Sequence, residues 1–203
     1  MCILVVKPRN KELMERKTLK AMFDNNPDGG GFAYANNGKV IIKKGYMNFN
    51  SFYNALLEVD REVGLYDKNV IIHTRITTSG GTSKELCHPF TVCDNFDTMR
   101  KTEIETELVL AHNGIFQQEY IPTKDMKKIN DTMIFIKNFI YPKFKEDSGF
   151  LNNNLVTEVI EKEIGTCKIA LLNKDGEVFK FGNFIQDDGI FYSNNSYIED
   201  DWY

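Results

Sequence analysis

Long apolar runs are absent from this sequence. No segment of its 203 residues approaches about 18 consecutive apolar residues, the length that a membrane-spanning helix requires. The first residues also lack the charged region and apolar stretch that together mark a secretory signal. We therefore expect a soluble, cytoplasmic protein with no membrane partner.

Charge of one sign and cysteine are also scarce. The formal net charge is -4, and lysines are interleaved with acidic residues and asparagines rather than gathered in a basic stripe. Because nucleic acids are bound through clustered Lys and Arg, we expect no nucleic-acid partner. The four cysteines are widely and irregularly spaced, at Cys2, Cys87, Cys93 and Cys167. That spacing, without a secretion signal, favours reduced thiols over a disulfide framework.

The chain has the length of one domain with a substantial core, and we predict a single domain over residues 1–203. Apolar periodicity and turn residues predict strands at 2–6, 32–35, 39–43, 70–77, 107–111, 167–172, 177–181 and 190–193. Helices are predicted at 11–22, 52–63, 132–140 and 155–163, with Tyr141-Pro142 ending the third. This order favours an α+β fold of antiparallel sheet layers covered by helices, rather than a parallel sheet.

Cys2 opens the apolar run Cys2-Ile3-Leu4-Val5-Val6, directly after the initiator methionine. Removal of that methionine would give one residue both a thiol and a free α-amino group. Since an α-amino group has a pKa of about 8, it can accept the thiol proton near neutral pH. Cys2 is therefore a candidate nucleophile that carries its own base. Taken alone, however, it is better explained as a small hydrophobic residue at the start of a strand.

Two further motifs combine polar residues with glycines. Asp28-Gly29-Gly30-Gly31 predicts a loose turn, although three glycines also allow another chain or a ligand to approach the backbone closely. His73-Thr74-Arg75-Ile76-Thr77-Thr78-Ser79-Gly80-Gly81 brings a histidine, an arginine and several hydroxyls to a strand end. Arg75 suits a bidentate grip on a carboxylate. A surface strand whose arginine reaches into solvent is an equally good explanation.

Two later motifs also allow two interpretations. In His112-Asn113-Gly114-Ile115, the Asn-Gly pair is a strong hairpin-turn signal. Alternatively, the Asn113 side-chain amide and the Gly114 N–H form an oxyanion hole. Asp131 precedes a helical run, so it or a neighbour serves either as the helix N-cap or as a carboxylate that binds an ammonium group.

His88 stands in the segment Cys87-His88-Pro89-Phe90, and alone it is typical of a loop histidine with satisfied hydrogen bonds. Together with Cys87 and Cys93 it invites comparison with a zinc site. The intervals miss the usual short cysteine spacing and Pro89 follows directly, so we expect no metal and no cofactor.

In this order, the motifs resemble the class II glutamine amidotransferase domain, the N-terminal-cysteine glutaminase of the Ntn hydrolase superfamily. The resemblance covers essentially the whole chain and implies a four-layer αββα sandwich of two mainly antiparallel sheets flanked by helices. It is carried by Met1-Cys2, Asp28-Gly29-Gly30-Gly31-Phe32-Ala33, His73 through Gly80, Cys87-His88-Pro89-Phe90, Ala111-His112-Asn113-Gly114-Ile115 and Asp131-Thr132. The segment Tyr192-Ser193-Asn194-Asn195-Ser196-Tyr197 is similar to a late segment of some members.

The resemblance implies a catalytic role for three residues. Cys2 would attack the side-chain amide carbon of L-glutamine and form a γ-glutamyl thioester, with its α-amino group as the base. Asn113 and the Gly114 N–H would stabilise the oxyanion. Ammonia would leave first, and water would then release glutamate.

The resemblance also implies a set of substrate-binding residues. Arg75 would bind the α-carboxylate with the help of Thr78, Asp131 would bind the α-ammonium group, and His88 would belong to the same set. Ile76 and Ser79 depart from the family, since many members have Trp and His there. Those positions concern loop closure and pocket lining, so they affect glutamine affinity rather than the nucleophile.

The glutaminase domain would occupy the whole chain, which leaves no synthase domain to accept ammonia. We expect either a separate ammonia-accepting synthetase subunit or glutamine hydrolysis as the activity itself. The oligomeric state is not predicted.

Two other functions stay open: an Ntn hydrolase acting on another small amide, and a catalytically idle module that binds an amino acid or a partner. A module that only binds has no need of a nucleophile and an oxyanion pair, which Cys2, Asn113 and Gly114 supply together. Glutamate release from glutamine separates a glutaminase from an Ntn hydrolase that acts on another small amide. Labelling of Cys2 by a glutamine-like electrophile separates both from the idle module.

Overall fold

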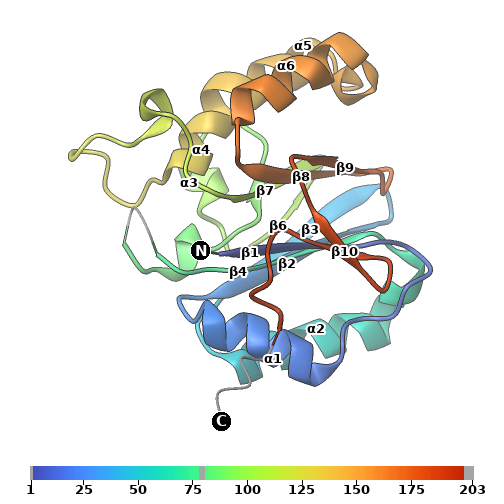
Figure 1. Ribbon diagram of the computed structural model, residues 1–203. Coiled ribbons are helices and arrows are strands. Elements are labelled where there is room, and N and C mark those ends of the chain that lie inside the picture. Colours follow the sequence, from blue (N-terminus) through green and yellow to red (C-terminus); the bar gives the residue numbers. More distant parts are fainter. Residues whose placement is uncertain (1, 78–80, 199–203) are drawn as a thin grey trace.

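The computed structural model describes residues 2–77 and 81–198. Two sheets lie face to face, and helices cover the outer face of each (Figure 1). Helices α1 (Arg16–Asn25) and α2 (Phe49–Val63) cover one sheet. The other is covered by a continuous helical segment, α4 (Asp131–Phe135), η4 (Ile136–Ile140) and α5 (Tyr141–Glu146), and by α6 (Asn154–Ile164). The predicted α+β sandwich of antiparallel sheets flanked by helices is confirmed.

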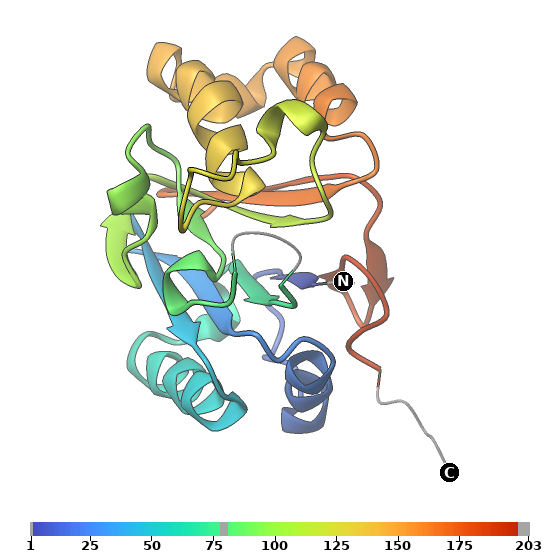
Figure 2. The ribbon, with the colours of Figure 1, turned by 90° about the vertical axis from the view of Figure 1, so that its left-hand side faces the viewer.

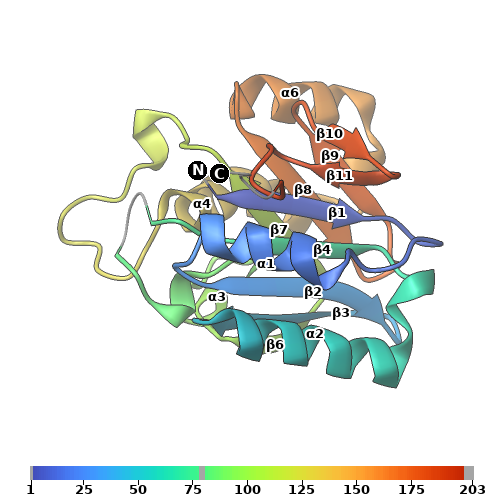
Figure 3. The ribbon, with the colours of Figure 1, turned by 60° about the horizontal axis from the view of Figure 1, so that its bottom comes forward.

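The larger sheet has seven strands in the described part of the chain. Their spatial order is β10 (Ile185–Asp187), β11 (Ile190–Tyr192), β1 (Ile3–Lys7), β4 (Val70–Thr74), β2 (Gly30–Asn36), β3 (Lys39–Tyr46) and β6 (Glu103–Thr106). Neighbouring strands pair antiparallel. Figure 3 shows α1 and α2 lying across this sheet. The strand β1 is central, so the start of the chain is fixed between β11 and β4.

The smaller sheet has four strands, again among the described residues, in the order β5 (Phe90–Thr91), β7 (Leu108–Asn113), β8 (Lys168–Asn173) and β9 (Val178–Phe181). All three pairings are antiparallel. A short helix, α3 (Phe96–Met99), and four 3-10 turns, Leu65–Asp67, Lys84–Leu86, Gln118–Tyr120 and Phe150–Asn152, connect the larger elements. None of the helices within the described ranges combines the length and apolar character that a membrane span requires.

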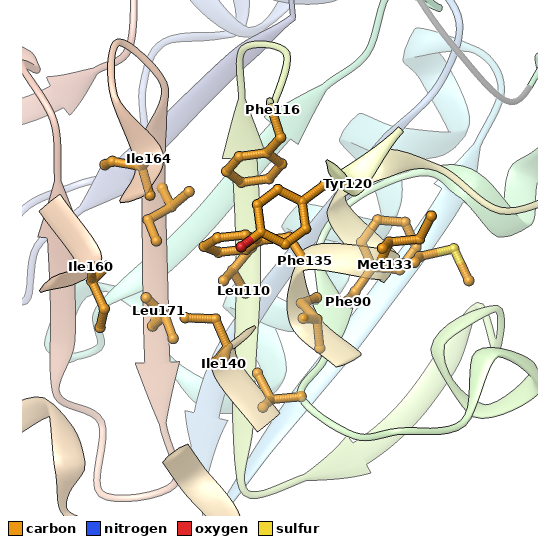
Figure 4. Close-up of a cluster of buried hydrophobic side chains, with 14 of the residues drawn as sticks. Phe90, Leu110, Phe116, Tyr120, Met133, Phe135, Ile140, Ile160, Ile164 and Leu171 are labelled. Carbon is orange, nitrogen blue, oxygen red and sulfur yellow. The ribbon is translucent and has the colours of Figure 1, made fainter. Parts of the chain in front are cut away.

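The core has three apolar layers, one between the sheets and one under each pair of helices. Leu4, Ile71 and Val109 belong to the layer between the sheets. Ile3 and Ile72, their strand neighbours, face α1 and α2 instead. This alternation follows from the period of two along a strand. Figure 4 shows the third layer, in which Phe135 and other side chains of the helical segment pack onto β7 and β8.

The start of the first predicted helix and the end of the third show the largest errors; the first helix also ends at Asn25 rather than at residue 22, and the second begins at Phe49 rather than at residue 52. The first helix begins at Arg16 rather than at residue 11. The buried ammonium group of Lys7 binds the carbonyl oxygens of Pro8 and Lys11, at 2.9 and 2.8 Å, and of Leu65, at 2.7 Å. Because the Lys11 carbonyl is engaged by Lys7, the segment before Arg16 stays non-helical.

The third predicted helix does not end at Tyr141-Pro142. It continues through the π-helical turn η4 into α5, which has Pro142 in its first turn. Proline is tolerated there because its ring fits the first helical turn and its missing N–H is not needed. The widened π turn before it makes this continuation possible.

Candidate functional site

Figure 2 shows the end of the sandwich at which β1 begins. At that end, the alternation of side chains along β1, β4 and β7 turns polar residues toward the layer between the sheets. The inter-sheet residues of these strands are Leu4 and Val6 in β1, Ile71 in β4, and Val109 and Ala111 in β7. Because side chains alternate along a strand, the same series continues to Cys2, Arg75 and Asn113. Leu4 pairs with His73 in the β1–β4 ladder, so Cys2 and Arg75 lie opposite each other. Residues from three separate parts of the sequence therefore meet at one place.

Cys2 is half-buried, and its thiol donates a hydrogen bond to the Ile76 carbonyl oxygen at 3.3 Å. Burial raises the pKa of the Cys2 thiol, although the bond to Ile76 and the positive charge of Arg75 act in the opposite direction. The thiol is therefore protonated at neutral pH, and it needs a base before it can attack. The hydrogen bonds of the described residues include none between a histidine ring and this thiol.

Arg75 is buried, with 3% of its surface exposed. Its backbone continues the pairing with β2, since its N–H donates to the Gly29 carbonyl at 2.8 Å and its carbonyl accepts from Asp28 at 2.8 Å. Its guanidinium Nη1 donates to the Gly81 carbonyl at 3.0 Å. The interpretation as a surface arginine reaching into solvent is wrong. Thr78, the residue expected to assist it, lies outside the described residues.

The predicted loose turn at Asp28-Gly29-Gly30-Gly31 does not form, because Gly30 and Gly31 belong to the strand β2. At Gly31, a Cβ atom would lie 2.3 Å from the His88 carbonyl oxygen and 2.5 Å from the Lys44 Cβ. The strand therefore needs glycine so that the His88 segment can approach its backbone. The predicted loose turn is therefore wrong, and what approaches the backbone here is a segment of the same chain rather than another chain or a ligand.

Asn113 ends β7 and Gly114 follows it, and they do not form a hairpin turn, since the partner strand β8 begins only at Lys168. The Asn113 amide Nδ2 donates to Ser193 Oγ at 2.8 Å, while Oδ1 is buried and makes no hydrogen bond within the described part of the chain. Gly114 has a φ of 143°, and a Cβ there would lie 2.6 Å from Cys167 Sγ. Packing against Cys167 thus explains this glycine independently of any catalytic role.

Asp131 is the first residue of α4, but the N-cap is Asn130, whose side chain accepts from the Met133 N–H at 3.0 Å. The Asp131 carboxylate accepts from two other backbone groups, Phe116 N–H at 3.2 Å and Thr132 N–H at 2.8 Å. Burial raises the pKa of this carboxyl group, although those hydrogen bonds oppose the shift. Asp131 is therefore a rigidly held carboxylate that a bound cation would stabilise in its charged form.

All three histidines of the chain lie together, because the ring centroid of His88 is 4.3 Å from that of His73 and 6.4 Å from that of His112. His88 Nε2 and His112 Nδ1 lie 3.1 and 3.0 Å from Thr132 Oγ1, a hydroxyl that can donate to one ring and accept from the other. His73 Nε2 lies 3.1 Å from the His112 carbonyl oxygen and so connects β4 to β7. Burial lowers the pKa of His73 and of His112 to about 3, and that of His88 is also lowered by burial. These rings are neutral and hold strand ends together.

A metal site is not formed by these groups. The described residues contain no cluster of three or more His, Cys, Asp or Glu side chains arranged to hold a metal ion. All four cysteines, which lie within the described ranges, are free thiols.

Three residues in contact with the candidate site were not assigned a role from the sequence. Thr132 binds two of the histidines, Ser193 binds Asn113, and Asn194 Nδ2 donates to the Cys2 carbonyl oxygen at 2.7 Å. Thr132 and the segment containing Ser193 and Asn194 were part of the family resemblance, which was the signal available for them. Their contacts depend on the packing of distant segments.

Comparison with known proteins gives one family. The family model described as "Glutamine amidotransferases class-II" matches residues 13–132, which is more than half of the chain. The matched region includes Arg75, Asn113, Gly114 and Asp131, and it begins after Cys2. A search of curated proteins finds no match.

Proposed function

Because the chain belongs to the class II glutamine amidotransferases, we propose that it hydrolyses the side-chain amide of L-glutamine through a γ-glutamyl thioester on Cys2. The observation that carries this proposal is the convergence of the strands bearing Cys2, Arg75 and Asn113 at one end of the inter-sheet layer. Amide cleavage needs a nucleophile and an oxyanion donor, and a zwitterionic substrate needs a charged anchor. These three residues supply those functions.

Glutamine is bound in this proposal through both of its charges. The guanidinium of Arg75 pairs with the α-carboxylate in a bidentate geometry, and the Thr78 hydroxyl assists. The carboxylate of Asp131 pairs with the α-ammonium group. His88 supports this side of the pocket through Thr132, whose N–H donates to Asp131.

The reaction begins once Met1 has been removed and the α-amino group of Cys2 is free. That amine takes the thiol proton, and the thiolate attacks the amide carbon. The Asn113 amide and the Gly114 N–H stabilise the oxyanion. A single such donor contributes about 3 kcal/mol in comparable sites.

The protonated amine then gives its proton to the leaving nitrogen, the C–N bond breaks, and ammonia departs. Water, deprotonated by the same amine, cleaves the thioester and releases glutamate and the thiol.

We further propose that residues 1–203 form a single cytoplasmic glutaminase domain whose ammonia passes to a separate synthetase subunit. The charge pattern of the chain contains no basic stripe of the kind that binds a nucleic acid, which supports a small-molecule substrate in this proposal. If no partner accepts the ammonia and it is released into solution, glutamine hydrolysis is itself the activity of this protein.

The test combines intact-protein mass with an assay of glutamate release from glutamine. We expect an active protein whose mass lacks Met1, and loss of nearly all activity in Cys2→Ala and Cys2→Ser without a change in thermal stability, since small residues fit a strand start. Cys93→Ser is the matched control, because Cys93 is also half-buried but binds the Asn95 carbonyl away from this site. Full activity in Cys2→Ala, or an active protein that retains Met1, would overturn the mechanism.

A further inference from the structure

The segment that follows β11 contacts two of the proposed catalytic residues. Ser193 Oγ accepts hydrogen bonds from the Leu4 N–H at 2.9 Å and from the Asn113 Nδ2 at 2.8 Å. Asn194 Nδ2 donates to the Cys2 carbonyl oxygen at 2.7 Å. This segment lies outside the region that matches the family model, residues 13–132. Two adjacent residues therefore join the start of β1 to the end of β7.

The bond to Ser193 determines how the Asn113 amide is presented. Asn113 and Ser193 are each 3% exposed, so water is not a ready substitute for either partner. A side-chain amide can rotate and exchange its donor and acceptor ends. With one N–H held by Ser193 Oγ, the amide plane is fixed and the second N–H keeps a constant direction. Without that bond, the acceptor Oδ1 can turn toward the position of an oxyanion and destabilise it.

The bond from Asn194 acts on the nucleophile residue. Cys2 precedes β1, which begins at Ile3, so the ladder bonds within the strand do not secure it. Its carbonyl is held by Asn194 and its thiol by Ile76. Asn194 is itself fixed, because its Oδ1 accepts from the Ser196 N–H at 2.9 Å. A terminal residue would otherwise have several backbone conformations to lose before each attack.

We propose that Ser193 and Asn194 are positioning residues, of which Ser193 aims the Asn113 amide at the oxyanion and Asn194 holds Cys2 in the attacking geometry. The proposal rests on the glutaminase function proposed above. Both residues act through others and touch no substrate. Their loss should consequently reduce turnover while leaving the binding of glutamine nearly unchanged.

The test for Ser193 is a double-mutant cycle with Asn113, measured by kcat and KM for glutamine hydrolysis. We expect Ser193→Ala to lower kcat on the order of 10-fold, less than the roughly 10²–10³-fold cost of removing an oxyanion donor itself. KM should stay within about 2-fold. In an Asn113→Ala background, Ser193→Ala should cost nothing further. Equal losses in both backgrounds would mean that Ser193 only supports β1, and would overturn its assigned role.

Thr91→Val is the control for loss of a buried hydroxyl away from the site, since Thr91 bonds Thr106 at 2.6 Å.

Asn194 has a matched control in the next residue. Asn195 is exposed, so Asn195→Ala should leave kcat and KM unchanged, whereas Asn194→Ala should lower kcat at constant KM. Thermal melts of each variant show whether the fold is retained. Absence of glutamate release by the wild-type protein would refute the proposed function. Wild-type turnover that Ser193→Ala and Asn194→Ala both match would refute the positioning roles alone.

Discussion

Acidification should destabilise this protein through its three buried histidines. Burial lowers the pKa of His73 and of His112 to about 3, and it lowers the pKa of His88 as well. In the unfolded chain each has a pKa of about 6.5. Between these two pKa values the unfolded state binds protons that the folded state does not. The stability that the neutral histidines contribute is therefore fully present above pH 6.5 and is lost as the pH falls from there toward 3.

The size of the effect follows from the two pKa values. Between pH 7.5 and pH 5.5, a histidine whose folded pKa is about 3 loses somewhat over ~1 kcal/mol of stabilisation. His73 and His112 together lose roughly 2–3 kcal/mol, and His88 adds to this because its pKa shifts in the same direction. Since small domains are stable by roughly 5–15 kcal/mol, this loss is large.

Urea unfolding at both pH values measures the effect, and His73→Gln isolates one histidine. Glutamine retains a donor at the place of His73 Nε2, which reaches the His112 carbonyl, but it does not titrate. We expect the variant to lose about 1 kcal/mol less than the wild type over this pH interval. Asp131, whose pKa is raised by burial, contributes in the opposite direction, but equally in both proteins. An identical pH-dependent loss in wild type and variant would show that His73 is not a buried neutral histidine.

Two other predictions concern binding, turnover and packing. Arg75→Ala should mainly raise KM for glutamine, whereas Asn113→Ala should mainly lower kcat. The reason is that only the Asn113 side-chain amide interacts more strongly with the transition state than with the substrate. Unchanged steady-state kinetics in both variants would refute the site assignment. Gly31→Ala should destabilise the protein by about 3 kcal/mol in urea unfolding, because its Cβ would lie 2.3 Å from the His88 carbonyl oxygen. Gly149→Ala is the comparison, since its nearest contact would be 3.3 Å and it has no positive φ; equal losses in the two variants would show that Gly31 is not constrained.

Most strands and helices could be predicted because their apolar residues repeat with a period that depends only on neighbouring residues. The run from Ile3 to Val6 and the hairpin around Asn37-Gly38 are examples, and both are strands in the structure. The strands β6 and β10 were missed because their residues are partly or fully exposed and carry no apolar run. The predicted start of the first helix at residue 11 was wrong because the side chain of Lys7 binds the Lys11 carbonyl, which a helix beginning there would have used.

The candidate site divides in the same way. The sequence by itself determined which residue types were present, Cys2, Arg75 and Asn113 among them, and their order indicated the family that the comparison found. Only the tertiary structure decided that Ser193 and Asn194 reach Asn113 and Cys2 across 80 and 192 positions, and that two of the three histidines contact one hydroxyl. The physical reason is that periodicity and turn chemistry act over a few residues, whereas these contacts form when two sheets pack and bring distant strand ends together.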